Sequence, residues 1–218
     1  MVVGRIINEI VLIVTALFPI VNPVGGAPIF LALTRDISPA ERRLLAWRVT
    51  VNGFFLLLGS ILIGSHVLSF FGVSLPIVQV GGGLVVISTS WAMLKREDEP
   101  DRHDVKRTAD SGVVLRKAFY PLTLPLTVGP GSIATAITLG ANEPGRGLTG
   151  IALGLAAAVA GALIVCLTVF VCYGFSDRLV RLLGPAAVSV IVRLSAFLLT
   201  CVGLQIVWNG VSALVRTM

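Results

Sequence analysis

The chain has 218 residues, of which 56% are hydrophobic and 13% are charged. The charged residues fall into a few clusters separated by apolar stretches of about 20 residues or more, which indicates a polytopic membrane protein and leaves little chain for a soluble domain. The net charge of +6 is explained by an uneven distribution of Lys and Arg between loops, so no nucleic-acid partner is expected.

The apolar stretches predict an all-α integral membrane protein with six membrane-spanning helices. In chain order these spans are 10–33, 47–71, 75–94, 118–141, 148–175 and 188–215. A cleavable signal segment is an alternative for the first stretch, because Arg5 precedes an apolar run. It is disfavoured because Glu9 follows Arg5 and no convincing small-residue cleavage site precedes the prolines.

Lys and Arg are retained on the cytoplasmic side of short membrane loops, so their distribution predicts orientation. The N-terminal tail, the turn at 72–74, the loop at 142–147 and the C-terminal tail hold three of the 17 basic residues, namely Arg5, Arg146 and Arg216. The connections on the opposite side hold the other 14. Both termini are therefore predicted to lie outside the cell.

The segment FPIVNPVGGAPIF, residues 18–30, places three prolines and two glycines inside the first span. Proline cannot donate to the carbonyl four residues before it, so Pro23 frees the carbonyl of Pro19. A free carbonyl facing lipid costs several kcal/mol, and irregular backbone at membrane depth is tolerated only inside protein or beside a watery cavity. The helix at 10–21 is about 18 Å long and reaches the middle of a ~30 Å hydrocarbon core. The break is therefore predicted to face the protein interior near the midplane.

The second half of the chain repeats the proline spacing of the first. A shift of 102 residues aligns PIVNPVGGAP with PLTLPLTVGP, whereas another register sets Asn22 and Pro23 on Gly129 and Pro130, and both registers stay open. Each half has three spans, an odd number, so the second half enters the membrane from the opposite side. The sequence predicts two inverted three-helix repeats in which spans 1 and 4 are discontinuous.

The predicted organisation is a first repeat at 1–94, a charged cytoplasmic linker at 95–117 and a second, inverted repeat at 118–218. The linker mixes both charge signs with little apolar content, which is typical of a solvated segment. Ser38 to Glu41, SPAE, matches a capping box with proline at the first helical position and predicts a helix start before span 2.

The two breaks carry partial charges that suit a zwitterion. Each second half-helix begins with free N–H groups, with Pro28 or Pro130 suited to its first position, and each preceding half-helix ends in free carbonyls. The neighbouring side chains are small or uncharged, so a small neutral amino acid is the predicted ligand. The alternative is that both breaks are packing kinks, since Gly and Pro are common in membrane helices. The predicted substrate-binding residues are Asn22, Pro23, Gly25, Gly26, Thr123, Thr127, Gly129, Pro130, Gly131 and Ser132.

The segments LFPIVNPVGGAPIFLALT, SPAERR and PLTVGPGSIAT resemble the MarC family of prokaryotic membrane proteins. The resemblance covers nearly the whole chain, and its NPxG and GPG signatures lie at 22–25 and 129–131. It implies a plasma-membrane protein of a group that includes SnatA-type transporters of glycine and other small neutral amino acids. The family usually has arginine before the glycines of span 3, whereas Gln79 stands there in this chain and Arg193 occupies the matching place in span 6.

The resemblance also implies coupling to a proton gradient, for which membrane proteins usually use Asp, Glu or His. The six predicted spans contain no Asp or Glu, which disfavours a carboxylate relay. His66 is the remaining candidate of this kind, and its place near the outer end of span 2 favours an interfacial histidine. Na⁺ held by freed carbonyls and uncoupled movement stay open. His66, Gln79 and Arg193 are candidates for gating or coupling, with snorkelling as the alternative for Arg193.

The predicted function is a transporter of small neutral amino acids that holds its substrate at the midplane between broken helices 1 and 4 and works by alternating access. The alternatives are an amino acid or drug exporter, and an aquaporin-like channel, although aquaporins carry their motifs on half-helices additional to six spans. An enzyme is disfavoured because no GxSG with a partner histidine, paired carboxylate or metal cluster occurs at membrane depth. No cofactor or metal is expected, and small residues in span 5 leave a homo-oligomer open.

The distribution of basic residues generates a test of orientation. Tags at either terminus should be accessible to a membrane-impermeant reagent from outside the cell, while cysteines placed at 95–112 should be labelled only after the cytoplasmic face is exposed. A C-terminus accessible only from the cytoplasm would contradict the inverted arrangement.

Overall fold

The computed structural model describes residues 2–95, 118–141 and 148–217, and those residues are almost entirely helical, with no strand among them. The all-α prediction is therefore confirmed. Most of the predicted linker at 95–117 and the loop at 142–147 lie outside the described residues. The helices are α1 (Val2–Val21), α2 (Pro23–Leu33), α3 (Pro39–Phe70), α4 (Leu75–Lys95), the π-helical segment η1 (Ala118–Thr127), α6 (Pro130–Ala141), α7 (Leu148–Gly174) and α8 (Ser176–Thr217).

Five stretches are long and apolar enough to cross a membrane, and a sixth is obtained if η1 and α6, which are bent by 69° at their junction, count as one span. The five stretches are Gly4–Leu33, Pro39–Phe70, Leu75–Lys95, Gly150–Gly174 and Ala186–Arg216. Large apolar side chains such as Phe55, Phe70 and Trp208 are exposed on their outer faces. An apolar surface of this extent is suited to contact with lipid acyl chains.

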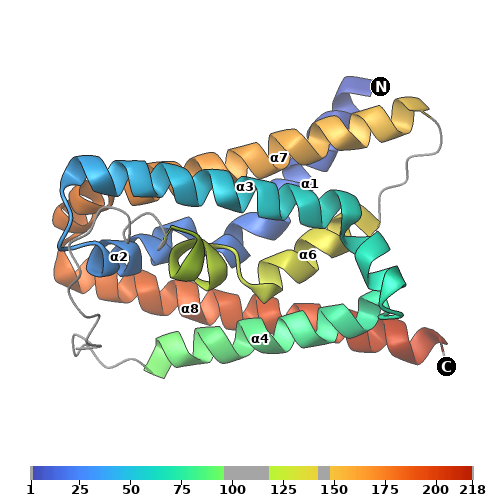
Figure 1. Cartoon of the computed structure of the whole chain (residues 1–218). Coiled ribbons are helices and arrows are strands. Elements are labelled where there is room, and N and C mark those ends of the chain that lie inside the picture. The colour runs from blue at the N-terminus through green and yellow to red at the C-terminus, as the bar shows by residue number, and fades with distance from the viewer. Residues whose placement is uncertain (1, 96–117, 142–147, 218) are drawn as a thin grey trace.

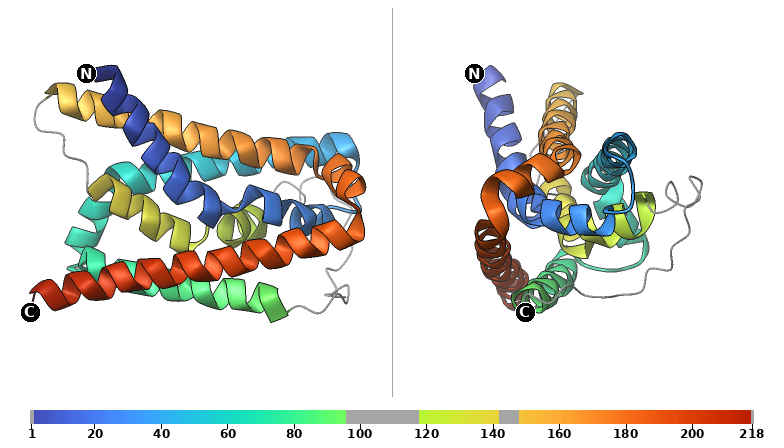
Figure 2. Two further views of the ribbon diagram at one scale, coloured as in Figure 1. Left: turned by 180° about the vertical axis from the view of Figure 1, so that it is seen from behind. Right: turned by 90° about the vertical axis from the view of Figure 1, so that its left-hand side faces the viewer.

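The helices form two outer pairs with the broken elements between them. Figure 1 shows α3 and α7 along one side and α4 and α8 along the other, while α1, α2, η1 and α6 lie between these pairs. The reverse view in Figure 2 shows the same arrangement. Both termini lie at the end of the molecule that also holds the turn between α3 and α4 (Figure 1).

The buried core lies where the broken elements meet the α3 and α7 pair. Leu17 of α1, Phe30 of α2, Leu57 of α3 and Val165 of α7 are fully buried members of one apolar cluster, to which η1 and α6 also contribute. The break at Asn22 and one face of η1 are therefore covered by packed side chains, whereas Tyr120, Pro121 and Pro125 of η1 are exposed.

The outer pair α4 and α8 is held together by close backbone approach at glycines. A Cβ atom added to Gly83 would lie 2.7 Å from the carbonyl oxygen of Gly203, and one added to Gly210 would lie 2.7 Å from that of Pro76. These contacts run in opposite directions along the two helices, so α4 and α8 are antiparallel. Small residues at such an interface let the helix backbones approach closely and gain dispersion energy.

The first helix begins earlier than predicted, at Val2 instead of Ile10. Arg5 and Glu9 therefore lie inside the first apolar stretch, Gly4–Leu33, with Arg5 Nε 3.2 Å from Glu9 Oε1. Opposite charges four residues apart on a helix face each other and stabilise it, which explains why the helix continues past Ile10 toward the N-terminus. Two of the apolar stretches, Gly4–Leu33 and Pro39–Phe70, begin before the predicted spans and so include the acidic residues Glu9 and Glu41.

The capping box predicted at the start of α3 is present, and a glycine interrupts α8. At the start of α3, the Ser38 hydroxyl accepts from the Glu41 N–H at 3.3 Å and the Glu41 carboxylate accepts from the Ser38 N–H at 2.9 Å, which confirms the capping box. Gly184 interrupts α8 with a φ of 73°, a left-handed conformation that favours glycine.

Arg42, in the first turn of α3, connects three elements. Its side chain is buried, and it donates from Nε to the Thr34 hydroxyl at 3.1 Å and from Nη2 to the Thr34 carbonyl at 2.8 Å. Its Nη1 forms an ion pair with Asp177 at the start of α8. Thr34 caps the C-terminus of α2, where a positive charge is electrostatically favoured. Arg42 therefore holds the end of α2 against the start of α8.

Replacement of Arg42 by Ala should lower the stability of the detergent-solubilised protein by about 1–3 kcal/mol, because it removes the ion pair with Asp177 and leaves the buried Thr34 carbonyl with only the longer bond from the Ile37 N–H, at 3.5 Å. Arg42→Lys should recover part of the loss, since an ammonium keeps the charge but not the forked geometry. Thermal unfolding measures the effect, with Arg48→Ala as the matched control because Arg48 is an exposed residue of the same helix. Equal melting temperatures for Arg42→Ala and Arg48→Ala would contradict the assigned role.

Candidate functional site

The first break is formed at Asn22, between α1 and α2. Asn22 has a φ of 46° and a ψ of 59°, the left-handed conformation that asparagine tolerates better than most residues, and its side-chain Oδ1 accepts from the Gly25 N–H at 3.1 Å. Pro23 follows at the first position of α2, where its missing N–H costs nothing. The expectation that Pro28 occupies that position was wrong, because the Asn22 cap starts α2 one turn earlier and leaves Pro28 inside the helix.

Asn22 accepts hydrogen bonds from two backbone N–H groups at the start of α2. Its side chain binds the Gly25 N–H, its backbone carbonyl accepts from the Gly26 N–H at 2.9 Å, and Pro23 has no N–H to offer. The positive end of α2 is therefore largely neutralised by its own capping residue. This break is less suited to an anion than the sequence predicts.

The second break lies in η1 and at its junction with α6. Tyr120 and Leu124 have extended backbone angles inside η1. The hydroxyl of Thr123 donates to the Ala118 carbonyl and that of Thr127 donates to the Leu122 carbonyl, both at 2.7 Å. Threonine side chains thus supply donors to backbone carbonyls in a segment where Pro121 and Pro125 supply none.

The start of α6 faces α4. A Cβ atom added to Gly82 would lie 3.6 Å from the Pro130 carbonyl oxygen and 3.8 Å from the Gly131 Cα, and one added to Gly131 would collide with Val86. The buried Ser132 hydroxyl donates to the Gly129 carbonyl at 2.9 Å instead of capping the helix N–H groups. The first-turn N–H groups of Gly131 and Ser132, which an α-helix leaves without intrahelical acceptors, therefore provide the better positive end.

Tyr173 of α7 links the two breaks and was not predicted. Its side chain is fully buried, and its hydroxyl lies 3.1 Å from the Thr127 Oγ1 at the second break. At the first break, a Cβ atom added to Gly26 would lie 2.5 Å from the same hydroxyl oxygen. The sequence signal was a tyrosine inside an apolar span, because a buried phenol requires a hydrogen-bond partner.

The predicted site residues therefore separate into two groups. Gly26 and Thr127 meet at Tyr173, with Asn22 and Gly25 completing the first turn of α2 beside Gly26. The remaining residues lie apart from that contact. Thr123 is turned to its own segment, whereas Gly129, Pro130, Gly131 and Ser132 form the junction with α6 and its first turn next to α4.

The three gating candidates lie in separate places. Gln79 donates from Nε2 to the Thr138 hydroxyl at 3.3 Å and so connects α4 with α6. His66 and Arg193 are exposed, on α3 and α8 respectively. Because α4 and α8 are antiparallel with Gly83 against Gly203, Gln79 and Arg193 lie on opposite sides of that contact, about 20 Å apart along the helices. The structure does not bring the three residues together.

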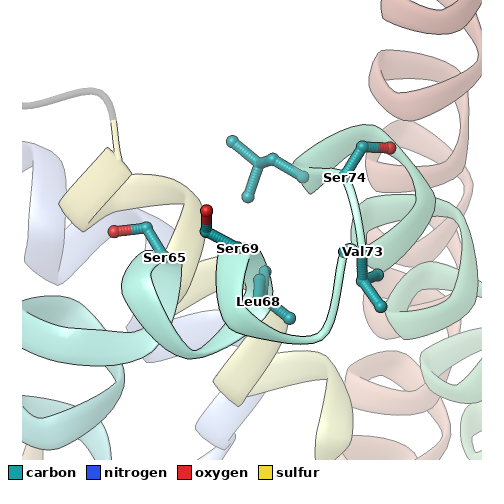
Figure 3. A pocket seen from close by; sticks show the side chains of 7 residues that line it. Ser65, Leu68, Ser69, Val73 and Ser74 are labelled. Carbon is teal, nitrogen blue, oxygen red and sulfur yellow. The ribbon is translucent and has the colours of Figure 1, made fainter.

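One open pocket of about 350 Å³ lies away from the breaks, at the turn between α3 and α4. Figure 3 shows Ser65 and Ser69 on the last turns of α3 and Ser74 across the turn. None of the predicted substrate-binding residues lines it. Around the breaks, Phe30 of α2 stacks on Tyr173 of α7 with ring centroids 4.5 Å apart, and Val128 is fully buried and faces Gly53 of α3.

Comparisons with known proteins identify the family. Residues 7–215 match the model of the MarC family of integral membrane proteins. The chain is 29% identical to the inner membrane protein MarC of Salmonella typhimurium, covering 92% of this chain and 93% of that protein. It is 31% identical to MarC of Escherichia coli O1:K1, with 92% and 93% covered, and 29% identical to the membrane protein YvbG of Bacillus subtilis, with 94% and 95% covered. No solved structure matches the chain. The chain belongs to the MarC family of integral membrane proteins.

Proposed function

We propose that this MarC-family protein is a transporter of small neutral amino acids of the glycine and alanine class, which binds its substrate between the broken helices α1–α2 and η1–α6. The observation that carries the proposal is the position of the Tyr173 hydroxyl, which contacts Thr127 at one break and lies against Gly26 at the other. Two interruptions that are distant in sequence thus converge on one buried polar group. Two independent packing kinks would not require this convergence.

The chain is proposed to consist of two inverted three-helix repeats, with the first and fourth spans discontinuous. The helix directions support this arrangement, because α1–α2 runs away from the end that holds the termini while η1–α6 runs toward it (Figures 1 and 2). The pairs α3 and α7, and α4 and α8, are reversed in the same way. The helix starts at Pro23 and Pro130 favour the register that aligns Asn22 with Gly129.

The chemistry of the breaks supports a zwitterion with a small side chain. The carboxylate is assigned to the N–H groups at the start of α6, because those at the start of α2 are largely occupied by Asn22. The ammonium group is assigned to the irregular carbonyl end of η1 or of α1. Gly129 keeps the approach to the backbone free of side chains, whereas Gly26 is covered by the Tyr173 hydroxyl.

Alternating access is proposed over a permanently open channel because Phe30, Val128 and Tyr173, which adjoin the breaks, are fully buried in close packing. A passage there requires these side chains to move. The same close packing favours a substrate of few atoms over a drug-sized molecule, which typically occupies a pocket of 300 Å³ or more.

The proposed location is the inner membrane of a prokaryote with both termini outside, in line with relatives that are named inner membrane proteins. The proposal includes H⁺ and Na⁺ as the two candidate coupling ions. Glu9 joins His66 as a titratable residue inside an apolar helix, although its partner Arg5 supplies the opposite charge. Homo-oligomerisation is compatible with the proposed mechanism and is not required by it.

Purified protein reconstituted into vesicles should take up radiolabelled glycine and alanine in exchange for internal unlabelled substrate. Imposed proton and sodium gradients, each compared with no gradient, identify the coupling ion. Transport of water or glycerol without amino acid uptake would instead support the channel alternative, and no movement of any of these solutes would contradict the proposal.

Gly129 provides the sharpest substitution test, because a Cβ atom added there would meet only the Pro125 carbonyl, at 3.3 Å. Gly129→Ala should be folded and should weaken glycine binding about 10-fold, and Gly129→Leu should abolish it, since the added carbons occupy the space the substrate needs. Gly25 is less suitable, because a Cβ atom there would collide with the Asn22 cap.

The matched control is Gly59→Leu in α3, where an added Cβ atom meets nothing within 4 Å. It should bind and transport glycine like the parent protein. If folded Gly129→Leu also does so, the second break is only a kink and the substrate binds elsewhere.

A further inference from the structure

Basic and aromatic side chains gather where the start of α3, the end of α7 and the start of α8 meet. These three helix ends lie together at the end of the molecule opposite the termini (Figure 1). Phe175 connects α7 with α8, and two guanidinium groups lie over its ring, with Cζ of Arg43 5.7 Å and Cζ of Arg178 5.8 Å from the ring centroid. Two arginines that are distant in sequence therefore converge on one aromatic side chain.

The position of Arg43 is fixed by its surroundings on α7. Its Cγ would lie 3.9 Å from a Cβ atom added to Gly174, so its aliphatic stem crosses the end of α7 at a residue that has no side chain. Its Cζ also lies 5.9 Å from the ring centroid of Phe170. A cation over an aromatic ring is attracted by the quadrupole of the ring, so Phe170 and Phe175 together hold the guanidinium in place. The positive charge is therefore positioned without a ligand.

The two arginines are exposed, and neither pairs with a carboxylate among the residues that the structure describes. The nearest acidic residues along the chain are Glu41 and Asp177. The first caps the start of α3, and the second pairs with the buried Arg42. The charges of Arg43 and Arg178 can therefore be offered to an external anion.

Trp47 indicates how deep this cluster lies in the membrane. It follows Arg43 by one turn of α3, is 53% exposed, and packs edge-on against Phe170 with ring centroids 5.6 Å apart. Exposed tryptophan is typical of the boundary between hydrocarbon and lipid headgroups. One helical turn is about 5.4 Å long, so Arg43 lies that much nearer the aqueous end of α3, at the level of the headgroups.

Apolar side chains continue from the arginines along the start of α8. Phe175, Arg178 and Leu182 follow one another at intervals of three and four residues, so they share one side of the helix. Leu182 is 86% exposed and Phe175 is 39% exposed. Exposed apolar side chains beside a cation suit a membrane interface, where the apolar groups meet acyl chains and the cation meets anionic headgroups.

We propose that Arg43 and Arg178 bind the phosphate group of an anionic phospholipid. Their planar, forked guanidinium groups donate to the phosphate oxygens, while Trp47 and Leu182 contact the glycerol end of the acyl chains. A lipid is favoured over an acidic protein segment because the cluster continues directly into the lipid-facing surface at Trp47. This lipid site does not depend on the proposed transport function.

The test titrates the detergent-solubilised protein with phosphatidylglycerol, and separately with zwitterionic phosphatidylcholine, and counts the bound lipid by native mass spectrometry. The parent should bind phosphatidylglycerol more tightly than phosphatidylcholine. Arg43→Gln and Arg178→Gln should each weaken phosphatidylglycerol binding about 5-fold, and the double substitution should weaken it about 30-fold, which is the contribution expected of arginines near an anionic membrane surface.

Arg48→Gln is the matched control, because Arg48 is another exposed arginine of α3 and its replacement changes the charge equally. It lies five residues after Arg43, about 1.4 helical turns, and therefore on a different face, so its phosphatidylglycerol affinity should equal that of the parent. The double substitution Arg43→Lys with Arg178→Lys keeps both charges without the forked donors and should recover part of the loss. Melting temperatures measured without lipid show whether each variant is folded.

Three results would overturn the proposal. The first is equal phosphatidylglycerol affinity in the parent and in the double glutamine variant, and the second is an equal loss in Arg48→Gln, which would reduce the effect to net charge. The third is binding of soluble glycerol 3-phosphate as tightly as the lipid, because the acyl chains would then contribute nothing. Displacement of the lipid by an equal concentration of a polyglutamate peptide would instead assign this face to an acidic protein partner.

Discussion

The backbone of a membrane protein must find all its hydrogen-bond partners within the protein, because hydrocarbon offers none. In this chain two helices are interrupted by prolines, and at each interruption nearby polar side chains supply hydrogen-bond partners for the backbone. Asn22 binds the Gly25 N–H at the first break, and Thr123 and Thr127 donate to carbonyls at the second. The surrounding helices cover the first break and one face of η1, while Tyr120, Pro121 and Pro125 are exposed.

The polar side chains at the two breaks have different effects on the partial charge of the helix that follows. An amide oxygen at the start of α2 neutralises the positive end of that helix, whereas threonine hydroxyls in η1 bind carbonyls and leave the N–H groups of α6 alone. Two segments with similar proline spacing therefore present different partial charges to the space between them. In the proposed inverted arrangement the two breaks match in path and differ in charge, and this difference supports the proposal of a substrate with one cationic and one anionic end.

The sequence was sufficient for those features that depend on composition and local signals. Span positions followed from hydropathy, and the start of α3 followed from the pattern of Ser38 and Glu41. The choice of Pro28 as a helix start failed because it depended on the backbone angle of Asn22, which only the fold determines. Glu9 was left outside the first span because that span was taken to begin at Ile10, whereas the helix extends back to Val2 with Glu9 paired to Arg5.

Tyr173 could not be assigned from sequence, because its importance comes from distance in space and not from a motif. It lies 46 residues from its hydrogen-bond partner Thr127. A tyrosine in an apolar span indicates a buried polar contact, but the pattern does not name the partner. The site residues that sequence reasoning did identify are those marked by prolines and glycines, which disturb the helix locally and are visible without the fold.

The glycine contacts between α4 and α8 bear on how the molecule can move. Side chains that interlock can exchange one rotamer for another as helices slide, whereas backbone atoms in direct contact, as at Gly83 and Gly203, have no rotamers to exchange. The α4 and α8 pair is therefore expected to move as a single rigid body. Because α4 comes from the first half of the chain and α8 from the second, this rigid pair connects the two halves. Any movement is then expected in the short segments α2, η1 and α6.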